Sequence, residues 1–286
     1  MACAETAAYA MTPVTAPGPR AGPADGQSRR VKLVGIAFDR LTETEVIEHI
    51  IDAMHRGRGG WVVTPNIDIC RLAVRDLRLQ ELISSASLVV PDGMPLLWAA
   101  ALGGDPLAER VTGSSLIYSL TAAAAQHERS IYLLGGDPSV PARAAGRLRR
   151  LHPGLMIAGT DAPPADLDMT DDGIDIIRAR LAATTPDIVY VGLGFPKQER
   201  LVARIAPAFP ATWFIGCGAA IPFVAGTIPR APRWMQRVGA EWLFRLAIEP
   251  RRLAGRYLVH DLPFAARLLV GPAAERFWAG GPVKRR

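Results

Sequence analysis

One aspartate of this chain, Asp92, stands between a proline and a glycine at the end of a short apolar run. The run Leu88–Val90 predicts a buried strand, so the carboxyl group that follows it is expected to be partly desolvated. Desolvation raises the pKa of a carboxyl group toward the range that suits a general base. A Pro-Asp-Gly sequence equally suits a turn or a helix cap, and on sequence alone that structural role stays open.

A second segment combines glycines with polar side chains. The apolar run Val189–Val191 leads into Gly192 and Gly194, and Pro196 then opens an expected helix. Free backbone N–H groups at a helix start attract anions. Because Gly-x-Gly without a third glycine does not indicate a dinucleotide site, an ordinary strand-to-helix turn is the alternative. The polar residues that open the helix are Lys197, Gln198 and Glu199.

Two further strand ends, and Arg110 in the segment Glu109–Gly113, carry groups that could bind a ligand. Thr64 and Asn66 offer a hydroxyl and an amide suited to a sugar, and Arg110 has the two-pronged geometry that holds a diphosphate. Gly135 and Gly136 leave room for a nucleotide. The structural alternatives are helix capping for the first two, a surface ion pair for the arginine and a tight turn for the glycines.

The elements that must position these residues alternate between strand and helix. Strands are expected at 31–38, 61–64, 88–90, 131–134, 156–158, 187–191 and 212–215, and helices after the capping box at 42–45 and at 67–80, 114–126, 139–151 and 174–183. This alternation predicts an α/β fold, a Rossmann-like and mainly parallel sheet flanked by helices. In such a sheet all four ligand-binding loops open onto one rim, at the carboxyl ends of the strands.

Composition divides the 286 residues into three parts. Residues 1–30, rich in Ala, Pro and Gly and without a signal-peptide pattern, are expected to form a disordered tail. Residues 31–228 form the α/β domain, and residues 229–286 form a basic, helical appendage. That appendage holds 12 Lys or Arg and 4 Asp or Glu, a net charge of +8, which suggests an anionic partner surface; a solvated helical face is the alternative.

Several classes of protein are disfavoured by the sequence. The uncharged segment 205–229 is interrupted by four prolines, so no transmembrane helix is expected. Three cysteines without ligand spacing suggest a reducing compartment. Asp166 and Asp168 form an Asp-x-Asp pattern, but they lie in a Pro/Ala-rich loop before a helix, where acidic residues favour the helix start. We therefore expect no metal, no cofactor and no nucleic acid partner.

The blocks taken together resemble the WecG/TagA/CpsF family of bacterial glycosyltransferases. The resemblance runs in the family's order from Val31 to Tyr257 and rests on Thr64-Pro65-Asn66, Pro91-Asp92-Gly93-Met94-Pro95, Glu109-Arg110-Val111-Thr112-Gly113, Leu134-Gly135-Gly136, Gly192 to Glu199, Ala225-Gly226, Arg230-Ala231-Pro232, Glu241 to Leu246, Glu249 to Arg252 and Arg256-Tyr257. Two positions depart from the family pattern, which usually has an aspartate where this chain has Ser115 and Pro222.

The resemblance implies an inverting, metal-independent transfer of a sugar, best assigned as N-acetylmannosamine, from a UDP-sugar to a polyprenyl-diphosphate-linked acceptor. It implies a place in teichoic acid or surface polysaccharide synthesis. Asp92 matches the family's general base. The expected donor-binding residues are Thr64, Asn66, Arg110, Gly135, Gly136, Gly194, Lys197, Gln198 and Glu199. The expected contacts to the acceptor and to an anionic membrane are Arg230, Arg233, Arg237, Arg245 and Arg252.

This interpretation predicts a cytoplasmic enzyme that associates with the inner face of the plasma membrane. It leaves open whether the enzyme forms a homo-oligomer. Two alternatives belong to other classes. A non-catalytic accessory subunit would be expected to lack the base, whereas Asp92 is present. An NAD-type oxidoreductase would need a complete Gly-x-Gly-x-x-Gly turn, which the chain does not contain.

Overall fold

The computed structural model describes residues 30–164 and 170–279, without the side chains of Arg233, Arg237, Arg252 and residues 272–279. Its centre is a parallel sheet of six strands in the order β4-β3-β8-β7-β5-β6. The strands are β3 (Gly60–Val63), β4 (Leu88–Val89), β5 (Ser130–Leu134), β6 (Met156–Asp161), β7 (Ile188–Val191) and β8 (Trp213–Gly216). The predicted parallel α/β fold is confirmed.

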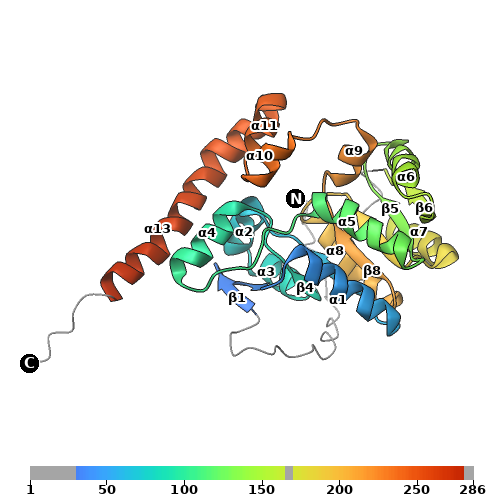
Figure 1. The fold of residues 1–286 in the computed structure, drawn as a ribbon, viewed down its shortest axis with the longest axis horizontal. Coiled ribbons are helices and arrows are strands. Elements are labelled where there is room, and N and C mark those ends of the chain that lie inside the picture. Colours follow the sequence, from blue (N-terminus) through green and yellow to red (C-terminus); the bar gives the residue numbers. More distant parts are fainter. Residues whose placement is uncertain (1–29, 165–169, 280–286) are drawn as a thin grey trace, which may run out of the picture.

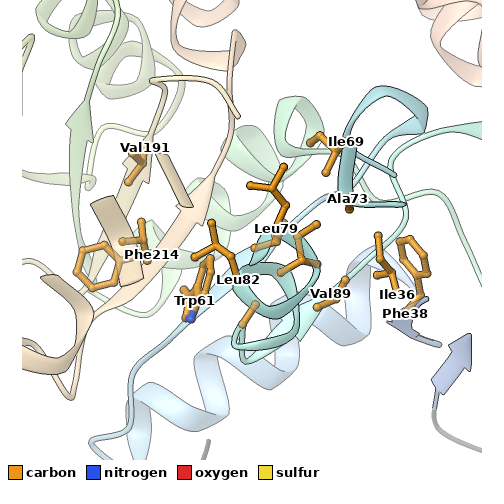
Figure 2. Close-up of a cluster of buried hydrophobic side chains, with 14 of the residues drawn as sticks. Ile36, Phe38, Trp61, Ile69, Ala73, Leu79, Leu82, Val89, Val191 and Phe214 are labelled. Carbon is orange, nitrogen blue, oxygen red and sulfur yellow. The ribbon is translucent and has the colours of Figure 1, made fainter. Parts of the chain in front are cut away.

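Helices cover both faces of this sheet and make three layers (Figure 1). One face packs against α1 (Glu43–His55), α5 (Gly113–Gln126), α6 (Val140–Leu151) and α9 (Ala220–Ala225). The other packs against α2 (Ile67–Arg75), α3 (Leu77–Ser84), α4 (Met94–Gly103), α7 (Asp171–Thr184) and α8 (Lys197–Ile205), the last followed by a 3₁₀ turn at Ala206–Ala208. Figure 2 shows side chains of the second face, where Trp61, Val191 and Phe214 of the sheet lie on the same side as Leu79 and Leu82 of α3.

The single strand expected at 31–38 is wrong. The segment forms an antiparallel hairpin of β1 (Arg30–Leu33) and β2 (Ile36–Asp39), which is separate from the parallel sheet. Its two-residue turn has positive φ at both Val34 (46°) and Gly35 (84°), the geometry that reverses a chain between twisted strands. The Asp39 carboxylate accepts a hydrogen bond from Val89 N at 2.8 Å, which fastens the hairpin to strand β4.

The single helix expected at 67–80 is also wrong, because Asp76 divides it. This residue ends α2 and caps α3, where its side chain accepts a hydrogen bond from Arg78 N at 3.0 Å. An aspartate that caps a helix has extended backbone angles, so it cannot continue the helix before it. The other predicted elements are present, with bounds that shift by a few residues.

The predicted helical appendage is present. It contains α10 (Arg233–Arg237), α11 (Glu241–Ile248), α12 (Pro250–Ala254), the π-helical turn η2 (Gly255–Asp261) and the long helix α13 (Leu262–Ala279). Figure 1 shows α10 and α11 above the domain and α13 descending along α4. Across 30–164 and 170–279, no helix combines the length and the apolar character needed to cross a bilayer.

An ion-pair cluster joins this appendage to the α/β domain. Arg71 of α2 donates to Asp261 of η2 at 3.0 Å and also contacts Asp68. Arg256 of η2 contacts the same Asp68 at 2.9 Å. Arg71 and Asp261 are both buried, and each has an opposite charge beside it, as a buried ionic group requires.

Candidate active site

The carboxyl ends of the strands form one rim, on which the predicted loops lie. Asp92 N donates to Pro65 O at 3.0 Å, which ties the loop after β4 to the loop after β3. Val111 N donates to Pro91 O at 2.9 Å and brings the start of α5 beside Asp92. Gly113 at that start packs so closely on Cys217, after β8, that an added Cβ would lie 2.8 Å from the Cys217 Cα.

The two central glycine loops are joined by one side chain. The Gln198 Oε1 atom accepts hydrogen bonds at 3.2 Å from Gly194 N, after β7, and from Gly218 N, after β8. The Gln198 Nε2 atom donates to Glu199 Oε1 at 2.8 Å. Gln198 thus fixes the shape of the rim, and its predicted contact with the donor stays a prediction.

Glu199 is almost fully buried, with 2% of its surface exposed. Burial raises the pKa of its carboxyl group to about 7, and the hydrogen bond from Gln198 offsets part of that rise. Its Oε2 atom is buried without a hydrogen-bond partner in the part of the chain that the structure describes. Its predicted role as a direct donor contact stays a prediction.

Asp92 lies in a part of the rim where several charged groups act on it. Burial raises the pKa of its carboxyl group to about 6; the Arg110 guanidinium counteracts the rise and the Glu241 carboxylate adds to it. Arg245 and Arg230 lower the pKa further. A carboxyl group with this pKa is deprotonated near neutral pH yet still basic enough to take a proton, as general base catalysis requires.

Three arginines bring the appendage to Asp92. Arg110 donates to Gln236 O of α10 at 2.7 Å, and among the described residues it forms no ion pair with Glu109, the alternative weighed for it. Arg230 donates to Ser114 Oγ at 3.2 Å and stacks over the Tyr118 ring. Arg245 of α11 stacks over the Phe223 ring at 5.3 Å. Three partly buried cations beside one carboxylate form a surface that suits diphosphate groups.

The other predicted donor residues are spread along the rim. Asn66 caps α2 by accepting from Ile69 N at 3.0 Å, which confirms its capping role, and the half-buried Thr64 precedes it at the end of β3.

Gly135 and Gly136 follow β5, which is four strand spacings from β4, or about 19 Å. Lys197 is the first residue of α8. The structure therefore brings Thr64 and Asn66 near Asp92 and places the glycine pair further along the same rim.

Some predicted positions lie outside the described part of the structure. These are the side chains of Arg233, Arg237 and Arg252, the tail 1–29 and the acidic pair Asp166 and Asp168. Ser115, one of the departures from the family pattern, is described: its hydroxyl donates to Glu43 of α1 and to Thr112 O.

Sequence reasoning missed the carboxylate of Glu241, which acts on Asp92 from the appendage and lies 3.9 Å from Arg230. It also missed Ser114 as the partner of Arg230. Glu241 opens one of the family blocks, but the sequence did not assign it a role, since both residues gain their place only when the appendage packs on the start of α5.

The comparisons with known proteins identify the family of the chain. The profile of the "Glycosyl transferase WecG/TagA/CpsF family" matches residues 31–276. The chain belongs to this family. As a member of the WecG/TagA/CpsF family it is a glycosyltransferase, which confirms the resemblance found in the sequence.

Three similar proteins carry one common name, N-acetylglucosaminyldiphosphoundecaprenol N-acetyl-beta-D-mannosaminyltransferase. The protein from Bacillus spizizenii is 31% identical over 211 residues, which cover 73% of this chain and 79% of the relative. That from Staphylococcus aureus is 28% identical over 226 residues, covering 78% and 87%. A third, from Bacillus subtilis, is 28% identical over 195 residues, covering 68% and 73%.

Proposed function

We propose that this glycosyltransferase moves N-acetylmannosamine from a UDP-sugar to N-acetylglucosamine linked through a diphosphate to a polyprenol. The names of the similar proteins support the sugar and the acceptor. The observation that carries the proposal is the half-buried Asp92 on the ligand-binding rim, tied to the loop after β3, with a pKa of about 6 that three guanidinium groups lower.

In the proposed reaction, Asp92 takes the proton from the acceptor hydroxyl while that oxygen attacks the anomeric carbon of the donor. The attack comes from the face opposite the diphosphate, and the bond between the anomeric carbon and the diphosphate oxygen breaks. The configuration at that carbon inverts, and UDP leaves with the bonding electron pair. Arg110 and backbone N–H groups at the helix starts receive the negative charge that develops on UDP, without a metal ion. Thr64 and Asn66 bind the donor sugar from the strand next to Asp92.

The appendage supplies the acceptor side of the proposed site. Arg230 and Arg245 lie beside Asp92 and are both part of the basic segment. We assign them to the acceptor diphosphate, because each guanidinium group can donate two parallel hydrogen bonds to phosphate oxygens. The basic segment also attracts an anionic membrane surface, so the enzyme works peripherally at the cytoplasmic face, where lipid-linked acceptors are held.

The test is a transfer assay with a panel of UDP-sugars and a soluble acceptor, N-acetylglucosamine joined through a diphosphate to a short alkyl chain. Transfer from UDP-N-acetylmannosamine is expected, and Asp92→Asn is expected to reduce kcat by about 10²-fold or more. The matched control is Asp137→Asn, an exposed aspartate on the same rim. Equal turnover by wild type and Asp92→Asn would remove Asp92 from the base role, and absence of transfer with every donor would favour an accessory subunit.

A further inference from the structure

Helix α4 is a surface helix without a single polar side chain. Its residues Leu96, Ala99 and Ala100 are buried in the core beneath it. Its opposite side exposes large apolar groups, with 49% of Trp98 and 41% of Leu102 accessible. Surface helices ordinarily present polar residues to water, so this exposed face is typical of a helix that contacts another apolar phase.

The position of α4 links the proposed base to the appendage. The helix starts at Met94, two residues after Asp92, and Trp98 lies about 6 Å further along its axis. The turn between α10 and α11 sits on Met94, so closely that a Cβ at Gly239 would lie 2.2 Å from the Met94 Cγ. On another side, α13 runs along α4, as Figure 1 shows.

The neighbouring appendage exposes apolar side chains of its own. Leu262 and Val270 of α13 are 53% and 64% accessible, and Val259 of η2 is 64% accessible. Exposed arginines, Arg251 and Arg267, lie on the same helical segment. Apolar groups next to exposed cations form the pattern of a surface that lies in the interface of an anionic bilayer.

We propose that the exposed face of α4 is lipid-facing and, together with η2 and α13, docks on an anionic bilayer. Trp98 and Leu102 enter the acyl region, and Arg251 and Arg267 contact the headgroups. A bilayer is the occupant that the charge favours, since residues 229–286 carry a net charge of +8. At ten residues α4 is too short to span a membrane, so it lies in the surface.

This docking differs from membrane binding by the basic segment alone, because a helix of the α/β domain takes part in it. The loop that carries Asp92 is then held at the membrane surface, where a diphosphate on a lipid would be presented. The inference rests on the proposed function only for the identity of that acceptor. Membrane docking by α4 stands or falls independently of which sugar is transferred.

The experiment compares two double variants of the full chain. Trp98→Gln with Leu102→Gln removes the apolar face of α4. Leu77→Gln with Leu151→Gln is the matched control, since these leucines are 71% and 58% accessible on α3 and α6. Both proteins and the wild type are sedimented with vesicles of equal parts phosphatidylglycerol and phosphatidylcholine, and transfer to the soluble acceptor is measured alongside.

The affinity of the α4 variant for vesicles is expected to fall by about tenfold or more. Its transfer to the soluble acceptor should be unchanged, and the control should equal wild type in both measurements. Equal vesicle binding by all three proteins overturns the proposal. The proposal is also overturned if wild type and control are dimers and the α4 variant is a monomer. The exposed face of α4 would then be a contact between two copies of the chain. Unchanged vesicle binding with a selective loss of transfer to a long-chain acceptor in detergent also overturns it, in favour of a groove for the acceptor's own chain. Absence of transferase activity in the wild type would contradict the proposed function and leave the vesicle result to decide this one.

Discussion

The guanidinium of Arg110 donates a hydrogen bond to the main-chain oxygen of Gln236 at 2.7 Å. Arg110 is also the cation with the largest effect on the pKa of Asp92, and Gln236 belongs to the first helix of the appendage. The Arg110 side chain therefore acts electrostatically on the proposed base and also forms a hydrogen bond to the appendage.

Replacing Arg110 by alanine is expected to lower kcat/KM for transfer by about 10²- to 10³-fold, because the charge on the leaving UDP loses a donor. It is also expected to raise the pKa of Asp92, since Arg110 lowers that pKa, so the acidic limb of the pH profile moves to higher pH. The profile of kcat/KM from about pH 5 to about pH 9, a range about 2 units either side of neutral, measures both effects. Arg129→Ala, at the opposite end of the sheet, is the control; a loss of rate with no movement of the acidic limb would contradict the electrostatic part.

Replacing Glu241 by glutamine is expected to do the reverse. Glu241 raises the pKa of Asp92, so its neutral replacement should lower that pKa and move the acidic limb of kcat/KM to lower pH. Because Asp92 must be deprotonated to act as the base, activity at pH about 5.5 should then rise relative to activity at pH about 7.5. Glu249→Gln makes the same change of charge elsewhere in the appendage, and an identical shift in both variants would show that only net charge matters.

The sequence was most informative where local chemistry decides the outcome. The apolar run before Pro91-Asp92-Gly93 correctly predicts a buried strand with a carboxyl group at its end, and the alternation of elements predicts the parallel sheet. It failed at the turn of the first hairpin, because Val34 has a positive φ that valine rarely adopts and no turn motif announces it. A pattern of apolar residues alone could not separate one strand from two.

The contacts inside the site could not be predicted from local sequence patterns, because they join residues that are far apart in the chain. Arg110 and Gln236 are 126 positions apart, and nothing in either segment specifies the other. Gln198 looked like a solvated first helical turn or a ligand contact, yet it is buried and joins Gly194 to Gly218. Such roles depend on which strand tips become neighbours, and the order β3-β8-β7 is set by packing of the whole sheet.

The buried carboxyl group of Glu199 predicts a stability that depends on pH. Its pKa rises from an ordinary 4.5 to about 7 in the folded protein, so the folded state holds the proton more tightly than the unfolded one. Its contribution is therefore complete below pH about 4.5 and is lost as the pH rises through about 7, a change of about 3 kcal/mol in the free energy of unfolding.

Urea unfolding at pH about 5 and about 8.5 measures this loss, with Glu199→Gln as the test variant. Glutamine keeps an acceptor for Gln198 and carries no charge, so the variant should lose less stability than wild type between the two pH values. Asp92→Asn provides a comparison, because its pKa of about 6 contributes in the same direction. An equal pH dependence in wild type and Glu199→Gln would show that Glu199 is not the group responsible.

The cluster of Arg71 and Asp261 predicts that the appendage can be released by one substitution. Arg71→Leu leaves Asp261 buried without its closest cation, which is expected to cost about 3 kcal/mol or more. Because Asp261 belongs to η2, the loss should appear first as cleavage of the appendage by a protease while the α/β domain stays intact. Arg178→Ala, which breaks an exposed pair with Asp175 on α7, should change stability by about 0.5 kcal/mol at most and leave the cleavage pattern as it is. If the α/β domain of Arg71→Leu were cleaved as fast as its appendage, the ion pairs would be holding the whole fold and not the docking of η2.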